Sequence, residues 1–79
     1  MNREEIKEQL QVIVAKVVKL ESVTLNDETT ANDVEGWDSL SHMEIITEIE
    51  KSFNISFKLR ELSKLKNVGS IIDLISKKQ

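Results

Sequence analysis

Apolar residues recur at helical spacing in three stretches of the chain, and the first begins near the N-terminus. Its stripe consists of Ile6, Leu10, Ile13, Val14, Val17 and Val18. Because this spacing keeps every member on one side of a helix, it predicts a helix from Arg3 to Lys19. Asn2 is placed to cap that helix, and Glu4 and Glu5 fall in its favourable first turn. The valine content of residues 12–18 would also suit a strand, but the spacing and length favour the helix.

The second stripe predicts a helix from Ser39 to Phe53. At roughly 100° per residue, its core face consists of Ile45, Ile46, Ile49 and Phe53. His42 projects onto the middle of that arc, as a packed side chain or part of a cavity wall. Leu40 and Met43 fall to one side of the arc, next to Thr47, so they are predicted to face outward. They are interpreted as contacts for a partner, with core packing as the alternative.

The third stripe closes the chain. Its members are Val68, Ile71, Ile72 and Ile75, with Asn67 as the cap and Lys77 and Lys78 at the end. Before it, a brief helical turn between Leu59 and Lys64 is marked by Phe57, Leu59, Leu62 and Leu65. No segment offers a convincing strand. The pattern therefore predicts an all-α fold of three longer helices plus a short one, in a single domain spanning residues 1–79.

A long connection, residues 21–37, separates the first two helices. Its scattered apolar residues are Val23, Leu25, Ala31, Val34 and Trp37, among turn-forming Asn, Asp and Thr. A loop of this length in a small domain is usually functional or held down by its own side chains. Gly36 is expected to supply a tight bend before the second helix, and Trp37 to anchor the loop on the bundle.

The composition argues against catalysis by this chain alone. It has no Cys, no Tyr and one His, so it lacks disulfides, a Cys-based metal site and a ready set of nucleophile, base and orienting residue. Ser39 and His42 lie three residues apart, but no oxyanion-hole motif accompanies them. One His and scattered carboxylates show no metal-ligand spacing. Any reactive group would therefore have to come from outside the chain.

Charge is distributed unevenly along the sequence. Residues 21–50 hold nine acidic residues and no Lys or Arg, whereas residues 51–79 hold seven basic residues against two acidic ones. Such asymmetry suggests an acidic docking surface for a basic partner, and an unevenly charged solvated surface is the alternative. Glu44 and Glu48, on the solvent side of the second helix, are candidates for that surface. Nucleic acid is disfavoured because the basic residues lack an aromatic stacking platform.

Neither a signal peptide nor a membrane-spanning segment is recognisable in the sequence. The chain begins Met1-Asn2-Arg3-Glu4-Glu5, which lacks the apolar run of a signal peptide, and no apolar stretch approaches the length needed to cross a bilayer. We therefore expect a cytoplasmic protein without membrane insertion. Import into an organelle with removal of a leader is the alternative.

Ser39 stands where an irregular loop becomes a helix. A hydroxyl at a helix start lies beside unpaired backbone N–H groups and the positive end of the helix dipole, a place suited to a phosphate. Ser39 is therefore interpreted as a modification site. The alternative is an ordinary N-cap or first-turn residue.

Three segments together resemble the acyl carrier protein family: Asp38-Ser39-Leu40, the helix Met43–Phe53, and Val68–Ile75. The resemblance runs from Gly36 to the end of the chain without a gap, and residues 1–20 fit the first helix. It implies a four-helix bundle of acyl-carrier type. It also implies that Ser39 receives a 4′-phosphopantetheine group from coenzyme A through a Mg²⁺-dependent phosphopantetheinyl transferase. The thiol of that arm would then hold acyl groups as thioesters.

The resemblance also implies a set of partners. These are the transferase and acyl-activating, acyltransferase or synthase enzymes. The carrier itself is expected to be a monomer. The expected contacts with these enzymes are Leu40, Met43, Glu44, Thr47 and Glu48. Asp38 is expected to cap the second helix, to lie at the cofactor next to Ser39, and to offer its charge to basic surfaces of the transferase. The helix dipole would favour the phosphodiester of the arm by about 0.3–1 kcal/mol.

Three features depart from carriers of fatty-acid synthesis: Trp37 before Asp38, His42, and the basic stretch Lys58–Lys66 in place of an acidic third helix. A basic third helix should weaken docking onto positively charged fatty-acid enzymes. These departures favour a specialised carrier of a polyketide, nonribosomal-peptide, lipid or cell-surface polysaccharide pathway. An aminoacyl or peptidyl carrier, and a helical interaction module that is never modified, remain the alternatives.

Overall fold

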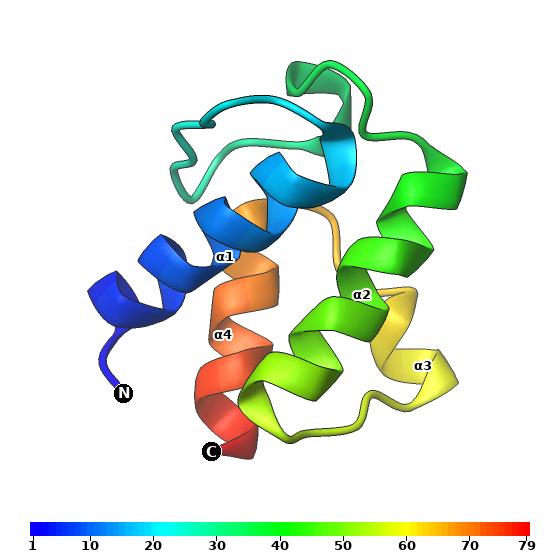
Figure 1. Cartoon of the computed structure of the whole chain (residues 1–79). Helices are drawn as coiled ribbons and strands as arrows, with labels where there is room; N and C mark the ends of the chain where they lie inside the picture. Colours follow the sequence, from blue (N-terminus) through cyan, green and yellow to red (C-terminus); the bar gives the residue numbers. More distant parts are fainter.

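The computed structural model describes all residues from Met1 to Gln79. Its elements are α1 (Arg3–Val18), a short 3₁₀ turn η1 (Ala31–Asp33), α2 (Ser39–Phe53), α3 (Leu59–Leu62) and α4 (Val68–Lys78). α1 packs against both α2 and α4, while the long loop between α1 and α2 covers one end of the bundle (Figure 1). The predicted all-α fold is confirmed, and the predicted bounds of the second helix agree with those of α2.

The helix starts follow the expected capping chemistry. The Asn2 side chain accepts the Glu5 N–H at 2.9 Å, and the Glu5 carboxylate accepts the Asn2 N–H at 3.1 Å. Asn67 caps α4 by accepting the Ser70 N–H at 2.8 Å. Both predicted caps are confirmed. α1 ends one residue before the predicted Lys19, because Lys19 adopts a left-handed backbone (φ 64°) that cannot continue a right-handed helix.

The three longer helices and the loop enclose one hydrophobic core. Its members are Ile6, Leu10, Ile13, Val14, Leu25, Trp37, Ile45, Ile46, Ile49, Phe53, Val68, Ile71, Ile72 and Ile75. The predicted core face of α2 is therefore confirmed. Val17 and Val18 lie at the margin, half-buried. Trp37 is 6% exposed, which confirms that it anchors the loop on the bundle.

The long loop is held down from Leu25 onward. Leu25 is buried, and its N–H donates to the Gln11 side chain at 2.9 Å. Two backbone hydrogen bonds join the loop to the start of α4: Val68 N–H to Thr29 O at 2.8 Å and Gly69 N–H to Asp27 O at 2.9 Å. The loop therefore belongs to the packed structure. η1 is an element that the apolar pattern did not predict.

The segment around α3 is shorter than predicted. The helix ends at Leu62 instead of Lys64, because the next backbone bonds are tight turns from Lys64 N–H to Glu61 O and from Leu65 N–H to Leu62 O. Phe57, Leu59, Leu62 and Leu65 were the apolar residues that marked this turn in the sequence. Phe57, Leu62 and Leu65 pack partly against the core, but Leu59 is 84% exposed.

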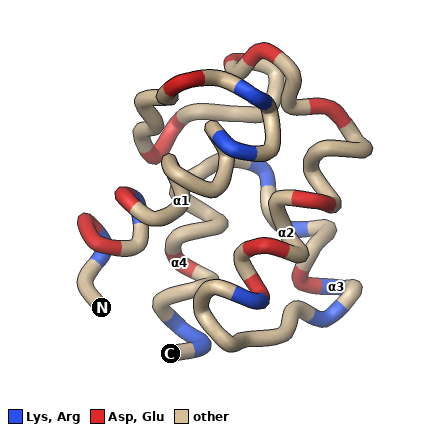
Figure 2. Tube along the Cα trace, viewed as in Figure 1, with Lys and Arg blue, Asp and Glu red and all other residues tan.

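The charge asymmetry of the sequence is also present in space. Acidic residues follow the long loop and α2, whereas basic residues gather around α3 and at the end of α4 (Figure 2). The two signs are not fully separated, however, because Lys16 and Lys19 at the end of α1 border the same groove as Glu44 and Glu48. No helix combines the length and the apolar character needed to cross a bilayer.

Candidate functional site

Ser39 is the first residue of α2, and its side chain is exposed. The residue before it, Asp38, has an extended backbone (φ −118°, ψ −168°) and forms the N-cap. The chain therefore turns from loop to helix immediately before the Ser39 hydroxyl. This placement leaves the hydroxyl open to a molecule that approaches from solvent.

The Asp38 carboxylate occupies the start of α2. Its Oδ1 accepts the N–H groups of Leu40 at 3.0 Å and of Ser41 at 2.9 Å. These bonds, the one from Ser41 above all, hold the pKa of Asp38 below its usual range. The sequence led us to expect unpaired backbone N–H groups here that could bind a phosphate. That expectation is wrong for the N–H groups of Leu40 and Ser41. A carboxylate already uses both donors, so it also offsets the positive end of the dipole.

Ser41 completes this arrangement, and sequence reasoning gave it no role. Its Oγ accepts the Asp38 N–H at 2.8 Å and donates to Gly36 O at 2.7 Å. The same hydroxyl thus ties the helix start to the turn before it. The signal was present in the sequence, because an Asp three residues before a Ser can form a reciprocal cap like that of the capping box.

Gly36 provides the expected bend. Its backbone has φ +87°, a conformation that residues with a Cβ rarely adopt. A Cβ at this position would lie 3.2 Å from the Val18 Cβ and 3.3 Å from the Val18 carbonyl oxygen. The turn before Ser39 therefore packs directly against the end of α1, and this close approach fixes where α2 begins.

Trp37 and His42 form a polar contact behind the site. The Trp37 indole N–H donates to His42 Nδ1 at 3.1 Å. Burial lowers the pKa of His42, which favours the neutral ring that this bond requires. Since His42 Nδ1 already accepts the hydrogen bond from Trp37, it is not available as a base for Ser39. The prediction that His42 is a packed, hydrogen-bonded side chain is confirmed.

The apolar residues predicted to face outward do so. Leu40 is 79% exposed and Met43 is 51% exposed. Thr47 is also exposed, and its hydroxyl donates to Met43 O at 2.9 Å. Whether these three residues contact a partner stays a prediction.

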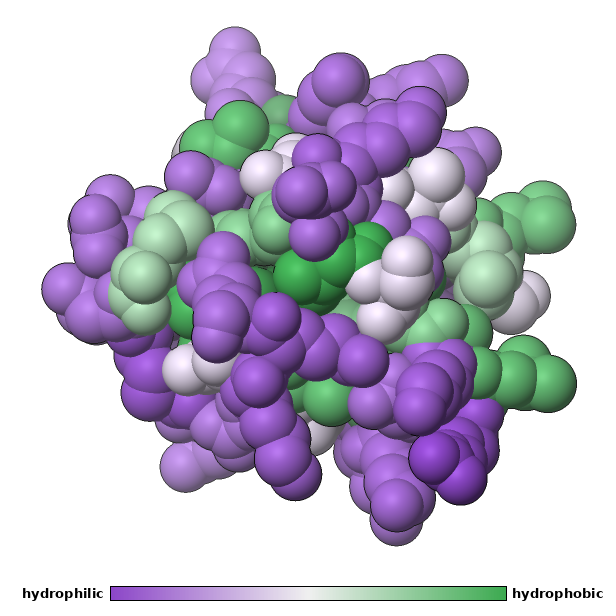
Figure 3. Space-filling model, turned by 90° about the horizontal axis from the view of Figure 1, so that it is seen from below, coloured by the Kyte–Doolittle hydropathy of each residue, from purple (hydrophilic) through white to green (hydrophobic).

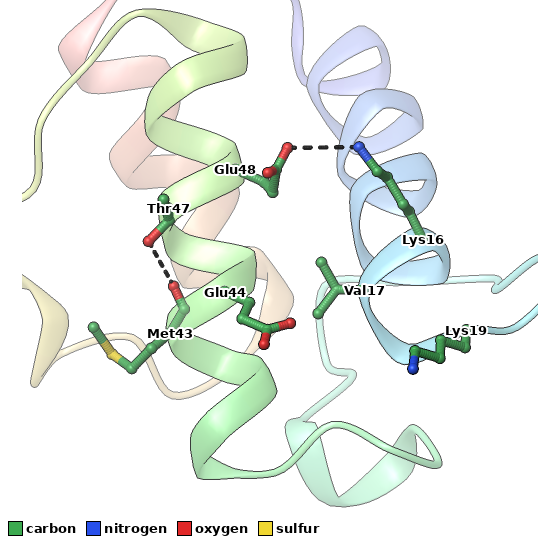
Figure 4. A pocket seen from close by; sticks show the side chains of 7 residues that line it. All are labelled: Lys16, Val17, Lys19, Met43, Glu44, Thr47 and Glu48. Carbon is green, nitrogen blue, oxygen red and sulfur yellow. Dashed lines mark hydrogen bonds and ion pairs between the residues drawn. The ribbon is translucent and has the colours of Figure 1, made fainter.

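Glu44 and Glu48 differ from one another. Both border an open groove of about 460 Å³ between α1 and α2, together with Lys16, Val17 and Lys19 (Figure 4). Glu44 is exposed and forms no ion pair within the chain, but Glu48 lies 3.9 Å from the Lys16 ammonium and is partly buried. The expectation that both face solvent alike is therefore wrong for Glu48, because α1 approaches it. Whether either carboxylate contacts a partner stays a prediction.

Ser39 supplies the exposed hydroxyl at the start of α2. No group of three or more His, Asp or Glu side chains is placed to hold a metal ion. The Ser39 hydroxyl forms no hydrogen bond with a base of this chain. What the arrangement provides is an accessible nucleophile on a firmly capped helix, flanked by two exposed apolar side chains. Such a hydroxyl suits modification by a separate enzyme.

Comparison with protein families gives a match over most of the chain. The family model described as "Phosphopantetheine attachment site" matches residues 8–75. The acyl carrier protein of Guillardia theta is 34% identical over 79 residues, which cover 99% of this chain and 96% of the relative. That of Thermosynechococcus vestitus is 31% identical over 78 residues, with the same coverage of both chains.

Solved structures show the same similarity. The solution structure of a holo acyl carrier protein from Geobacter metallireducens superposes with a TM-score of 0.83 at 48% identity, covering 90% of this chain and 82% of the other. A putative acyl carrier protein from Mycobacterium tuberculosis has a TM-score of 0.80 at 22% identity, covering 91% and 96% of the two chains. The second likeness concerns the fold alone.

Proposed function

This chain belongs to the acyl carrier protein family, and from that premise we propose that Ser39 is the residue to which 4′-phosphopantetheine is attached. A carrier of this family is not a catalyst but the substrate of its partner enzymes. It bears phosphopantetheine covalently, and the arm supplies the thiol that holds acyl groups as thioesters. The chain has no Cys, so a thiol can reach it only through such an attachment.

One observation carries the choice of residue: Ser39 is an exposed hydroxyl at the first position of a helix whose start is rigidly capped. Asp38 and Ser41 bond reciprocally around it, and Ser41 extends the network to Gly36. Fixing the backbone in advance reduces the entropy that a modifying enzyme must remove to align the nucleophile. The capping network therefore supports Ser39 as the presented group.

The attachment is a phosphoryl-group transfer. Ser39 Oγ attacks the phosphorus next to pantetheine in coenzyme A, and a phosphoester bond forms. The pyrophosphate bond of coenzyme A breaks, and adenosine 3′,5′-bisphosphate leaves. The hydroxyl proton passes to a base on the transferase, since this chain supplies none. The role of Asp38 in this step is to hold the helix start by its bonds to Leu40 and Ser41.

Intact-mass measurement tests the proposal. The protein is incubated with coenzyme A, Mg²⁺ and a promiscuous phosphopantetheinyl transferase. Wild type should gain the mass of one phosphopantetheine group, and Ser39→Ala should gain none. Ser52→Ala removes an exposed hydroxyl from the other end of the same helix, so it should gain the same mass as wild type. An equal gain on Ser39→Ala would disprove the assignment.

We also propose a type of pathway, a cellular location and a class of cargo for this carrier. The basic α3 region and Trp37 support a specialised carrier rather than one of general fatty-acid synthesis. It would act as a cytoplasmic monomer with acyl-activating, acyltransferase or synthase enzymes. The relatives named acyl carrier proteins support an acyl cargo over an aminoacyl one. Loading the modified protein with acyl-activating and with amino-acid-adenylating enzymes would test that preference.

A further inference from the structure

The side of α1 that faces away from the core carries an exposed apolar residue near its middle. At about 100° per residue, Val12 lies about 160° around the helix from Leu10 and from Val14, which are both buried in the core. Val12 itself is 68% exposed. Glu8 and Lys16, about one turn before and after it, are also exposed and border the same open groove of about 360 Å³. Glu8, Val12 and Lys16 therefore form one strip on the outer side of α1, the α1 strip.

The two charges of the α1 strip are open to a partner. Glu8 forms no ion pair within the chain. The nearby cations Arg3 and Lys7 pair with other carboxylates of the chain, so they do not neutralise Glu8. The Lys16 ammonium lies 3.9 Å from the Glu48 carboxylate, at the limit of an ion pair, and its side chain is 74% exposed. Lys16 can therefore meet a second carboxylate from outside the chain.

The outer side of α1 repeats its apolar residues and reverses its charge about Val12. Glu8 precedes Val12 by four residues, and Lys16 follows it by four. An exposed apolar side chain lies beyond each charge, Met1 before Glu8 and Leu20 after Lys16. Met1 borders a hollow together with Glu8 and Val12, and Leu20 borders the groove of the α1 strip. A second copy, rotated by half a turn about an axis through Val12, would place Glu8 opposite Lys16 and Met1 opposite Leu20.

We propose that the α1 strip is a contact between two copies of this chain, which pair with their first helices antiparallel about a two-fold axis through Val12. Val12 of one copy packs against Val12 of the other, and one ion pair between Glu8 and Lys16 forms on each side of the axis. Parallel helices would instead place Glu8 opposite Glu8 and Lys16 opposite Lys16, so the charge pattern selects the antiparallel arrangement. α1 contacts α2 and α4 through its other side, so the pairing leaves Ser39 exposed on both copies.

The pairing is weak, because it is made by one helix of each copy. A stable interface buries at least about 1,200 Å². Seen from below, hydrophobic side chains on the surface are mixed with hydrophilic ones (Figure 3), unlike the largely apolar interface of an obligate dimer. We therefore expect a dissociation constant of about 1 mM. Single copies predominate in dilute solution, where a partner enzyme meets a monomer, and pairs form where copies are crowded.

A second copy fits the α1 strip better than a membrane or a nucleic acid. Both of those are anionic over a wide area, so they would attract Lys16 but repel Glu8. A second copy supplies the opposite charge at both positions and an apolar side chain at Val12.

A single cysteine tests the pairing, because the chain has no Cys of its own. Val12→Cys places a thiol on the proposed axis, where two copies bring their Cα atoms within disulfide reach, about 4.4–6.8 Å. The unmodified protein is oxidised with copper phenanthroline at about 1 mM, and each rate is divided by the reactivity of that thiol toward a maleimide. Val12→Cys should form a covalent dimer about tenfold faster than Ser52→Cys, a variant with its thiol at an exposed position of α2.

Charge reversal separates this contact from general repulsion between copies. Glu8→Lys, added to the Val12→Cys protein, removes one negative charge and adds one positive charge, so the net charge changes from −3 to −1 and general repulsion falls. The proposal nevertheless predicts that cross-linking becomes at least about fivefold slower, because two cations then meet on each side of the axis. Adding Lys16→Glu restores both opposite-charge contacts and the net charge of −3, and should restore the rate.

Three outcomes would overturn the inference: equal cross-linking of Val12→Cys and Ser52→Cys, a rate that rises with Glu8→Lys, or a double charge reversal no faster than Glu8→Lys alone. Circular dichroism of each variant identifies any loss of folding. A measurement without cysteine variants uses translational diffusion by NMR. Diffusion of wild type should slow more on concentration than that of Glu8→Lys, and the same concentration dependence in both proteins would also overturn the inference. None of these results depends on the modification of Ser39.

Discussion

The Trp37 indole N–H donates to His42 Nδ1 across 3.1 Å, and this bond joins the last part of the loop to the first turn of α2. An indole N–H can only donate, so Nδ1 must be the unprotonated nitrogen and the ring proton must lie on Nε2. Trp37 itself is almost fully buried. The bond therefore couples the protonation state of one side chain to the anchoring of the loop that precedes Ser39.

Stability should depend on pH through His42. Burial lowers the pKa of His42, so the unfolded chain binds the proton more tightly than the folded one. Its contribution to stability should be fully present above the unfolded pKa, about 6.5, and should decline as pH falls toward the lower folded pKa. Urea unfolding followed by Trp37 fluorescence measures the effect.

His42→Gln is the control for this prediction, because a glutamine does not titrate. The variant should lose the part of the pH dependence that lies just below about pH 6.5, while the carboxylates keep their own contribution at lower pH. The opposite result would contradict the assignment of Nδ1 as acceptor: a wild-type protein whose free energy of unfolding rises as the pH falls below about 6.5.

Gly36→Ala should destabilise the protein. The position has φ +87°, and the added Cβ would meet the Val18 backbone and side chain at 3.2–3.3 Å. Because both the conformation and the space are unfavourable, we expect a loss of about 1–3 kcal/mol in the free energy of unfolding. Chemical denaturation gives this value. Ser56→Ala, at an exposed loop position, should change it by less than about 0.5 kcal/mol.

Asn67→Ala should remove the cap of α4. The Asn67 side chain accepts the Ser70 N–H at 2.8 Å, and alanine cannot replace that acceptor. The expected cost is about 1 kcal/mol, visible as a lower midpoint in thermal or urea unfolding. Asn67→Asp keeps an acceptor at the helix start and should restore most of the loss. If both variants are equally destabilised, the cap is not the source of the effect.

Charge reversal on α2 should separate Glu44 from Glu48. Glu44→Lys should slow modification of Ser39 and flatten its salt dependence, because this exposed carboxylate is free to meet a basic group. Glu48→Lys should chiefly cost stability, since it places a cation beside Lys16. Transfer rates and unfolding curves measured on both proteins make the comparison. Glu8→Lys, exposed on α1, is the matched control and should leave the transfer rate unchanged.

The local features of the fold could be predicted because local chemistry determines them. The bounds of α2, the caps Asn2 and Asn67, and the bend at Gly36 each follow from residue types a few positions apart. The outward placement of Leu40 and Met43 also followed from helical spacing. The family resemblance then added what spacing cannot supply, namely the chemistry attached to the site.

The features that were missed depend on what lies next to a residue in space. Glu48 lies on a polar side of α2, but its pairing with Lys16 requires knowledge of how α1 crosses. Leu59 belongs to an apolar pattern, yet a helix of four residues is too short to bury every member of it. The Asp38 cap itself was predicted, since Asp is a favoured N-cap, and it is confirmed, but the contribution of Ser41 was overlooked.

The contact between Gly36 and Val18 has one more consequence. It brings together two points that are eighteen residues apart along the chain, so the intervening segment crosses the end of the bundle and returns to nearly the same place. Within it, the stretch between Leu20 and Leu25 is largely exposed, and closure entropy grows only slowly with loop length. Extra residues inserted there would enlarge the loop without shifting Ser39. An epitope or a fluorescent label could therefore be inserted in this stretch without moving α2.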